Sequence, residues 1–397
     1  MLAIVAPGQG AQTPGLLVPW LDVPAAAALL RRAEAATGLG LIALGTTGSA
    51  EQIRDTAVAQ PLLAATALAA AAALDLLPEQ ADAPLPPAAA SVGAVAGHSV
   101  GELAAAVLAG VLGPEQALQL AAVRGLEMAR ACSSASTGML AVLGGDPDEV
   151  DAALARAGLV AANRNAPGQV VAAGPVAGLE ALEAEPPARA RLRRLEVAGA
   201  FHTGAMLPAR EALSRHVAAL PAGTARDPQL AFVTNGDGTV VTTGQEVLTR
   251  LVAQVAAPVR WDLCTATLSA RHIGALTELP PAGTLSAIAK RTLPGVEILA
   301  VRSPDDLAAA RTLLHPDPAG APEPGMPFRI AVAPSAGAFV PAAVGEGDRV
   351  AAGVALGQVR GRREQHDIRL DSDAVLIEWL ALDGDPVTPG QPLARLA

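Results

Sequence analysis

The chain has 397 residues, of which 51% are hydrophobic, so it is long enough for two or three domains and can bury a large core. Its net charge of -10 at pH 7 argues against a nucleic-acid partner, because no dense basic stripe is available to neutralise phosphates. The two cysteines, Cys132 and Cys264, are far apart and fit neither a metal-ligand spacing nor a disulfide framework.

The sequence also argues against targeting to a membrane. The run from Met1 to Ala6 has no basic region and reaches proline and glycine at once, so a strand is expected there and not a signal peptide. The longest apolar run, 61–77, is rich in alanine, is interrupted by Asp75 and is short for a membrane span, so a buried helix is expected. We therefore expect a soluble cytoplasmic protein without a membrane partner.

Strand-like apolar runs alternate with alanine- and leucine-rich stretches through the first three quarters of the chain. This alternation predicts an α/β domain with a largely parallel sheet. Helices are predicted at 24–36, 57–77, 101–109, 114–131 and 205–220.

The pattern changes between residues 128 and 198, where six shorter elements are expected. They are strands at 139–143, 159–163, 170–173 and 193–197, a helix that begins near Asp146, and a helix at 178–184. This order of strands and helices is that of a ferredoxin-like fold. We therefore divide the domain into a large part, 1–127 with 199–312, and an inserted ferredoxin-like part, 128–198.

Residues 313–326 contain four prolines and two glycines, which predicts a semi-rigid linker. Beyond it, residues 327–397 consist of short apolar segments separated by glycine and aspartate, which predicts a small, all-β, barrel-like domain. The segments expected to form its strands are 330–333, 337–340, 353–360 and 374–380.

The strongest chemical signal is the pentapeptide Gly97–Gly101 (GHSVG), which follows a small apolar run. Glycine at both ends permits the sharp strand-to-helix turn of a nucleophile elbow, with Ser99 at its tip. The helix that follows would direct free N–H groups at the place where an oxyanion develops. The pentapeptide alone is moderately specific, and an unreactive serine in a turn is the alternative.

A serine nucleophile needs a base, and histidine is the usual one. Among the six histidines, His202 follows a predicted strand and precedes a predicted helix, a position typical of a catalytic group on a loop. His98 lies in the elbow, where its side chain is expected to point away from Ser99. Taken alone, a histidine is more often structural than catalytic, so these positions leave the base open.

Five separated motifs resemble those of the malonyl-CoA:acyl-carrier-protein transacylases, the acyltransferase family of fatty acid and polyketide synthesis. The motifs are Pro7–Gln12 (PGQGAQ), Gln60–Leu63 (QPLL), Gly97–Glu102 (GHSVGE), Asn165–Val171 (NAPGQVV), and Ala200–His202 (AFH) with Gln254–Trp261 (QVAAPVRW). The resemblance covers roughly residues 1–312. It implies a hydrolase-like parallel-sheet core with the small subdomain inserted.

The resemblance implies a Ser–His dyad. Ser99 would be the nucleophile, His202 the base, and Gln254 the residue that orients the histidine through a backbone contact in place of a triad acid. The resemblance also implies an oxyanion hole formed by Gln9 and the backbone N–H of Val100.

The implied substrate site centres on Arg124, because a guanidinium binds a carboxylate in a bidentate fork and malonyl, unlike acetyl, has a free carboxylate. Phe201 and His98 would complete the site, with Phe201 leaving less room at the α-carbon, as in family members that select malonyl. The implied reaction transfers malonyl from coenzyme A to the phosphopantetheine thiol of an acyl carrier protein, without a bound cofactor. The alternatives are an acyl hydrolase that clears carrier proteins and an inactive scaffold that recruits them.

Residues 327–397 resemble a biotinyl/lipoyl-type domain in the segments Pro334–Phe339 (PSAGAF), Val344–Gly353 (VGEGDRVAAG) and Gly384–Leu393 (GDPVTPGQPL). Attachment of either group needs a lysine at a hairpin tip, but the only lysine, Lys290, belongs to the first domain. The hairpin region 360–367 offers arginines, which stay protonated and cannot form the amide. No covalent biotin or lipoate is therefore expected, and the alternatives that remain are a docking role, a spacer role or a relic of an attachment domain.

Overall fold

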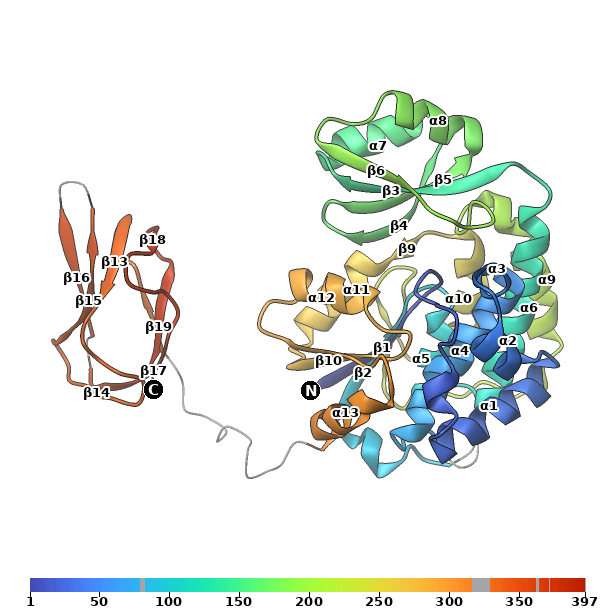
Figure 1. Ribbon diagram of the computed structural model, residues 1–397, viewed down its shortest axis with the longest axis horizontal. Helices are drawn as coiled ribbons and strands as arrows, with labels where there is room; N and C mark the ends of the chain where they lie inside the picture. The colour runs from blue at the N-terminus through green and yellow to red at the C-terminus, as the bar shows by residue number, and fades with distance from the viewer. Residues whose placement is uncertain (79–82, 316–328, 362–363, 371, 397) are drawn as a thin grey trace. The chain divides into compact units, whose positions relative to one another are not determined.

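A computed structural model describes residues 1–78, 83–315, 329–361, 364–370 and 372–396. The chain divides into two compact units, Met1–Pro316 and Asp317–Ala397, and each is described by itself (Figure 1). Of the predicted linker 313–326, residues 316–326 lie outside the described residues. Its predicted start is wrong, because Leu313 and the buried Leu314 belong to the last helix of the first unit.

A six-stranded sheet with the order β11-β10-β1-β2-β7-β8 forms the centre of the first unit. All neighbouring strands are parallel except β7 and β8. The strands are β1 (Leu2–Ala6), β2 (Val92–Gly97), β7 (Ala231–Val233), β8 (Val240–Val241), β10 (Ala275–Glu278) and β11 (Glu297–Ala300). All five residues of β1 are buried, as a parallel strand covered on both faces requires.

Helices cover both faces of this sheet (Figure 1). They are α1 (Pro24–Thr37), α2 (Leu41–Thr47), α3 (Ala50–Arg54), α4 (Thr56–Ala73), α5 (Gly101–Leu108), α6 (Pro114–Cys132), α9 (Leu207–Ala218), α10 (Gly244–Ala253), α11 (Trp261–Ala270), α12 (Thr284–Thr292) and α13 (Leu307–Leu314). Short 3₁₀ turns are η1 (Val18–Trp20), η2 (Pro87–Ser91), η3 (Gly204–Met206), η4 (Gln254–Ala256) and η5 (Pro304–Asp306). Along β1, Ile4 joins one apolar core and its neighbours Ala3 and Val5 join the other. The predicted mixed α/β architecture is confirmed.

The predicted helix at 57–77 is wrong at its end. Helix α4 begins at Thr56, where the Asp55 side chain caps it, and stops at Ala73, because the chain turns at Asp75 with φ of 56°. By length and hydropathy α4 could cross a membrane, but 83% of it is buried inside the fold. The helix predicted at 205–220 is instead the 3₁₀ turn η3 followed by α9.

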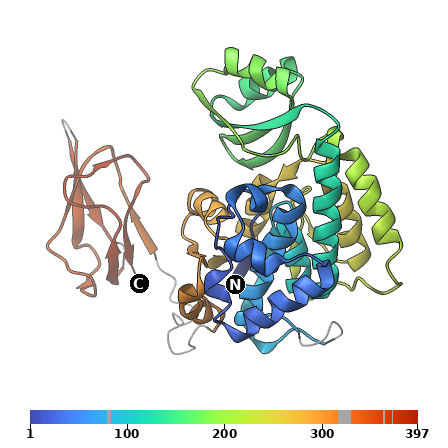
Figure 2. The same cartoon turned by 45° about the vertical axis from the view of Figure 1, so that its right-hand side comes forward.

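The inserted segment has its own sheet, with the order β6-β3-β5-β4-β9. Its elements are β3 (Thr137–Gly144), α7 (Pro147–Arg156), β4 (Val160–Ala166), β5 (Gln169–Pro175), α8 (Val176–Ala184), β6 (Ala190–Arg194) and, from the large part, β9 (Val259–Arg260). Strand β9 pairs in parallel with β4, so this edge of the small sheet is tied to the large part. Both views place α7 and α8 on the side of the small sheet that faces away from the large part (Figures 1 and 2).

The last strand of the insert is displaced from its predicted place at 193–197. Strand β6 pairs with β3 over Ala190–Arg194, at an edge where most of its side chains are exposed. The apolar residues Leu195 and Val197, which suggested the later position, pack instead against the core of the large part. Hydrophobic pattern therefore misplaced a polar edge strand by three residues.

The second unit is β-rich, as predicted, and consists of two four-stranded antiparallel sheets. Their orders are β12-β19-β17-β14 and β16-β15-β13-β18. The strands are β12 (Arg329–Val332), β13 (Gly337–Pro341), β14 (Arg349–Val350), β15 (Ala355–Arg360), β16 (Gln365–Arg369), β17 (Ala374–Trp379), β18 (Pro386–Val387) and β19 (Pro392–Leu396). If the strands β12, β13, β14 and β15 are exchanged with β16, β17, β18 and β19, in that sequence, one strand order becomes the other. The unit therefore has an internal twofold repeat. Its core includes Phe339 and Leu376.

Candidate active site

Ser99 stands at the turn between β2 and α5, with its backbone in the left-handed region at φ of 52°. A Cβ atom on Gly97 would lie 2.1 Å from the carbonyl carbon of Gly101, and one on Gly101 would lie 2.2 Å from the oxygen of Ala6. Only glycine fits at either position, because both distances are far below van der Waals contact. The pair thus permits the sharp turn that presents the serine hydroxyl.

His202 lies next to the serine, on the loop that leads into η3, and its own φ is 60°. Its Nε2 is 2.8 Å from the Oγ of Ser99, and its Nδ1 is 2.7 Å from the main-chain oxygen of Gln254. A carbonyl oxygen can only accept, so Nδ1 carries the hydrogen and Nε2 is free to accept the serine proton. This is the backbone contact that the family resemblance implied for Gln254.

Burial and the nearby positive charge of Arg124 lower the pKa of His202 to about 3. The imidazole is therefore neutral at pH 7, which is the form that can take a proton. Among the described residues, a carboxylate bonded to His202 is absent, so the geometry is that of a dyad.

Arg124 reaches the same point from α6 and is buried. Its Nη2 donates to the Oγ of Ser99 at 3.2 Å and to the Oε1 of Gln254 at 2.7 Å. Its Nη1 donates to the Oε1 of Gln60 at 2.5 Å. Burial lowers the pKa of Arg124 to about 10, so the guanidinium remains charged at neutral pH. A fixed cation thus lies within hydrogen-bond reach of the serine hydroxyl.

Two residues of this network were not assigned from the sequence, Gln60 and Glu102. Glu102 is completely buried in the first turn of α5; its Oε2 accepts from Gln254 Nε2 and its Oε1 from the N–H of Asn235, both at 2.5 Å. Burial raises the pKa of Glu102 to about 7. The signal available in the sequence was a single acidic residue in the otherwise apolar stretch 101–108.

The two residues expected to form an oxyanion hole flank the elbow. Gln9 follows β1, and its side-chain amide donates to the carbonyl of Arg54 at 3.3 Å. Val100 is the N-cap residue of α5. Neither backbone N–H makes a hydrogen bond within the part of the chain that the structure describes, so both remain able to donate to an anion.

His98 points to the small subdomain, where its Nε2 is 2.9 Å from the Oδ1 of Asn165 and its ring lies 5.8 Å from that of Trp261. Phe201, which directly precedes His202, is 6% exposed and joins the larger apolar core. Next to Ser99, on the side of Arg124, the free space is about 10 Å³, which holds about one water molecule. The interior therefore has no room for a long acyl chain on that side.

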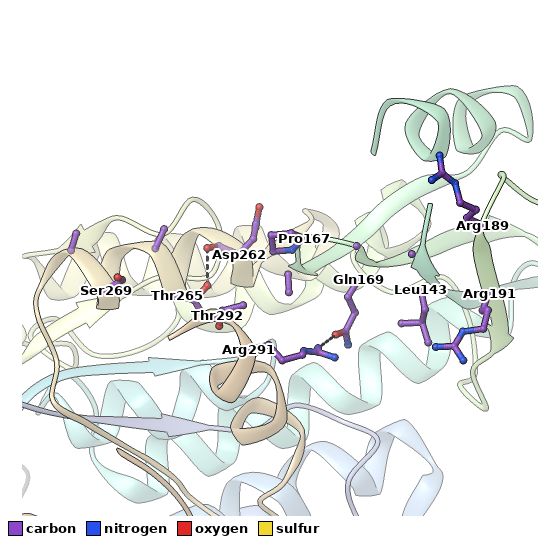
Figure 3. Close-up of a pocket in the computed structure, with 15 residues that line it drawn as sticks. Leu143, Pro167, Gln169, Arg189, Arg191, Asp262, Thr265, Ser269, Arg291 and Thr292 are labelled. Atoms are coloured by element: carbon purple, nitrogen blue, oxygen red, sulfur yellow. Dashed lines mark hydrogen bonds between the residues drawn. The ribbon is translucent and has the colours of Figure 1, made fainter. Parts of the chain in front are cut away.

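A basic cleft of about 970 Å³ lies between the β4–β5 hairpin and helices α11 and α12 (Figure 3). Arg189, Arg191 and Arg291 line it, and Arg291 donates to the side chain of Gln169. Arg191 lines this cleft, whereas Arg194, three residues later, pairs with Glu183 at 2.6 Å. Among the described residues, no three His, Cys, Asp or Glu side chains are grouped to hold a metal ion.

A serine on an elbow, a neutral histidine and backbone N–H groups free to donate are features suited to acyl transfer. The chain belongs to the acyl transferase domain family, which matches residues 4–306. It is 51% identical over 307 residues to a protein of Mycobacterium tuberculosis (strain H37Rv) named malonyl CoA-acyl carrier protein transacylase, covering 77% of this chain and 98% of that protein. An Escherichia coli K12 protein of the same name is 33% identical, covering 78% of this chain and 99% of that protein.

Solved structures give the same result. The crystal structure of MCAT from Mycobacterium tuberculosis has a TM-score of 0.73 and 49% identity, covering 78% of this chain and 99% of that one. A chain from the structure of a type II PKS acyl-carrier protein in complex with its malonyl-transacylase has a TM-score of 0.69 and 29% identity. The match covers 80% of this chain and 99% of that one.

Proposed function

We propose that this chain is an acyl-carrier-protein S-malonyltransferase, which moves a malonyl group from coenzyme A to the phosphopantetheine thiol of a carrier protein for fatty acid synthesis. The observation that carries the proposal is the buried guanidinium of Arg124, 3.2 Å from the hydroxyl of Ser99. Because malonyl has its carboxylate one carbon from the thioester carbonyl, a cation beside the nucleophile suits this acyl group. A polyketide pathway would use the same reaction.

In the first half-reaction the Oγ of Ser99 attacks the thioester carbonyl, and its proton passes to the Nε2 of His202. The N–H groups of Gln9 and Val100 stabilise the oxyanion. Collapse of the tetrahedral intermediate breaks the C–S bond, and the leaving thiolate takes the proton back from His202. A malonyl ester of Ser99 and free coenzyme A result.

The second half-reaction reverses these steps with another thiol. The phosphopantetheine thiol gives its proton to His202 and attacks the ester carbonyl. The C–O bond to Ser99 breaks, and the serine recovers the proton. No step needs a bound cofactor. The malonyl carboxylate pairs with Arg124 throughout, and Phe201 limits the space at the α-carbon.

The basic cleft gives the anionic part of coenzyme A a place to bind. It is lined by the hairpin that directly follows Asn165, and Asn165 is bonded to His98, the residue before Ser99. Arg191 and Arg291 are suited to the phosphates.

Intact-mass measurement after mixing with malonyl-CoA tests the proposal. The wild type should gain one malonyl group, which carrier protein should remove, and Ser99→Ala should gain none. A panel of acetyl-, methylmalonyl- and longer acyl-CoA should show the preference for malonyl. Labelling that survives Ser99→Ala, or acyl groups released to water faster than to carrier protein, would contradict the proposal and favour a hydrolase.

We also infer the finer fold classes of the three parts. The strand order β6-β3-β5-β4 with α7 and α8 supports a ferredoxin-like insert, and the elbow after a central parallel strand supports a hydrolase-like large part. The internal twofold repeat of eight strands supports a biotinyl/lipoyl-like second unit. In the sequence, Arg362 and Arg363 come between β15 and β16, and both lie outside the described residues. We assign the enzyme to the cytoplasm, where its substrates are made.

The second unit has no lysine for an attached group, but its hairpin region carries Arg360, Arg362 and Arg363 in the sequence, so we assign it a docking role toward an acidic surface of the carrier protein. A chain that ends at Pro316 tests this. It should form malonyl-serine at the wild-type rate from malonyl-CoA, but need more carrier protein for half-maximal transfer. An unchanged requirement for carrier protein would contradict the docking role without affecting the transferase.

A further inference from the structure

Glu102 is a completely buried carboxylate that the proposed mechanism leaves without a task. We propose that Glu102 is a positioning residue for malonyl recognition: it fixes the side-chain amide of Gln254, whose oxygen in turn holds Arg124 beside Ser99. The inference rests on the proposed malonyl transfer and deepens it, because it names the group that sets the carboxylate-binding arginine.

The hydrogen-bond chemistry permits one orientation of the Gln254 amide. An ionised carboxylate only accepts and a guanidinium only donates. The Gln254 Nε2 therefore faces Glu102, at 2.5 Å, and its Oε1 faces Arg124, at 2.7 Å. A turned amide would place an NH₂ group against the guanidinium and an oxygen against the carboxylate. Glu102 thus selects the orientation in which Gln254 supports the arginine.

Glu102 is itself held rigidly. The N–H of Asn235, which directly follows β7, donates to its second oxygen at 2.5 Å. The side chain of Asn235 donates to the carbonyl of Gly97 at 2.6 Å, at the start of the elbow. A carboxylate fixed at both oxygens transmits a fixed position to the amide it bonds.

The charge balance around Glu102 points the same way. The charged and titratable groups that interact with it are Arg124 on α6 and Cys264 on α11. The positive charge of Arg124 favours the ionised form of Glu102, whereas burial disfavours it. Glu102 is therefore the counter-charge that keeps a buried guanidinium in place.

Glu278 provides a matched control, because it is also a completely buried carboxylate. It lies at the end of the parallel strand β10. Its oxygens accept from the N–H groups of Gly283, Leu285 and Ser286 at 2.7–3.0 Å, and so cap α12. This role is structural. Glu278→Gln should lower the melting temperature without changing which acyl group is chosen.

Glu102→Gln tests the proposal. In this variant the oxygen of the new amide must accept from the N–H of Asn235. Its NH₂ group therefore faces the NH₂ group of Gln254, and the Gln254 amide has to turn or move away. The ratio of kcat/KM for serine acylation by malonyl-CoA to that by acetyl-CoA should fall about 10- to 100-fold, the range for a hydrogen bond to a charged group. Glu278→Gln should keep the wild-type ratio. Equal losses for both substrates in Glu102→Gln would overturn the proposal.

A measurement on the wild type covers the case in which Glu102→Gln does not fold. The pKa of Glu102 is raised to about 7, so lowering the pH protonates it while His202, with a pKa of about 3, stays neutral. A protonated Glu102 directs an O–H donor at the Nε2 of Gln254, which is also a donor, so the hydrogen bond between them is lost. The malonyl-to-acetyl ratio should therefore fall as the pH decreases through about 7, and a constant ratio would overturn the proposal. If the wild type forms no malonyl-serine at any pH, the proposed function fails instead.

Discussion

The main-chain oxygen of Gln254 lies 2.7 Å from the Nδ1 of His202, where a Ser–His–Asp triad has its carboxylate. A carbonyl fixes the tautomer but carries no full negative charge, so it stabilises the imidazolium less. Burial and the charge of Arg124 lower the pKa of His202 to about 3, although the bond to the Gln254 oxygen raises it. The base is therefore held in its neutral form throughout the neutral range.

Replacing the base should abolish most acylation. His202→Ala should slow malonyl-serine formation about 10²- to 10⁴-fold, the usual contribution of a general base, measured by rapid-quench intact mass. His216→Ala, a histidine on α9, is the matched control and should keep the wild-type rate. Because the pKa of His202 lies far below its free value, acylation by acetyl-CoA should not decline until the pH approaches 3. A decline near pH 6.5, the ordinary value for histidine, would contradict the assigned environment.

Replacing the buried arginine should change which acyl group is accepted. Arg124→Ala should reduce kcat/KM for malonyl-CoA by about 100-fold or more, since it removes a charge-assisted contact and leaves Gln60 and Gln254 without their donor. Acetyl-CoA should lose much less.

Arg130, near the end of the same helix, pairs with Glu127 at the surface, so Arg130→Ala is the matched control. Equal losses for malonyl- and acetyl-CoA in Arg124→Ala would show that Arg124 supports the fold and does not read the carboxylate.

Features with a local cause could be predicted from the sequence. The elbow at Ser99 follows from two glycines around a serine after an apolar run, and helices α1, α5 and α6 were placed within one residue at each end. The network beneath the elbow could not be derived locally, because Glu102 and Gln254 are 152 positions apart and meet only when α5 packs against η4. Short helices such as α3, with five residues, lack enough periodicity to be recognised.

The glycine that opens the elbow should not tolerate a methyl group. In Gly97→Ala the new Cβ would lie 2.1 Å from Gly101, between β2 and α5, and must displace backbone. The free energy of unfolding should fall by about 1–3 kcal/mol or more, with loss of acylation, measured by denaturant unfolding and intact mass. Gly40→Ala is the control, because Gly40 has open space around it and φ of -75°. A Gly97→Ala variant as stable and active as Gly40→Ala would contradict the elbow geometry.

The basic cleft should affect binding of coenzyme A and leave the chemistry unchanged. Arg291 lies in the last turn of α12, exposed in the cleft beside Gln169, where it can reach a phosphate (Figure 3). Arg291→Ala should raise KM for malonyl-CoA about two- to five-fold, as expected for an exposed ion pair, with little change in kcat. The difference from wild type should shrink as salt screens the charge. Arg302→Ala, an exposed arginine after β11 and outside the cleft, should have no effect. An unchanged KM for malonyl-CoA in Arg291→Ala, together with a raised KM for carrier protein, would assign the cleft to the protein partner instead.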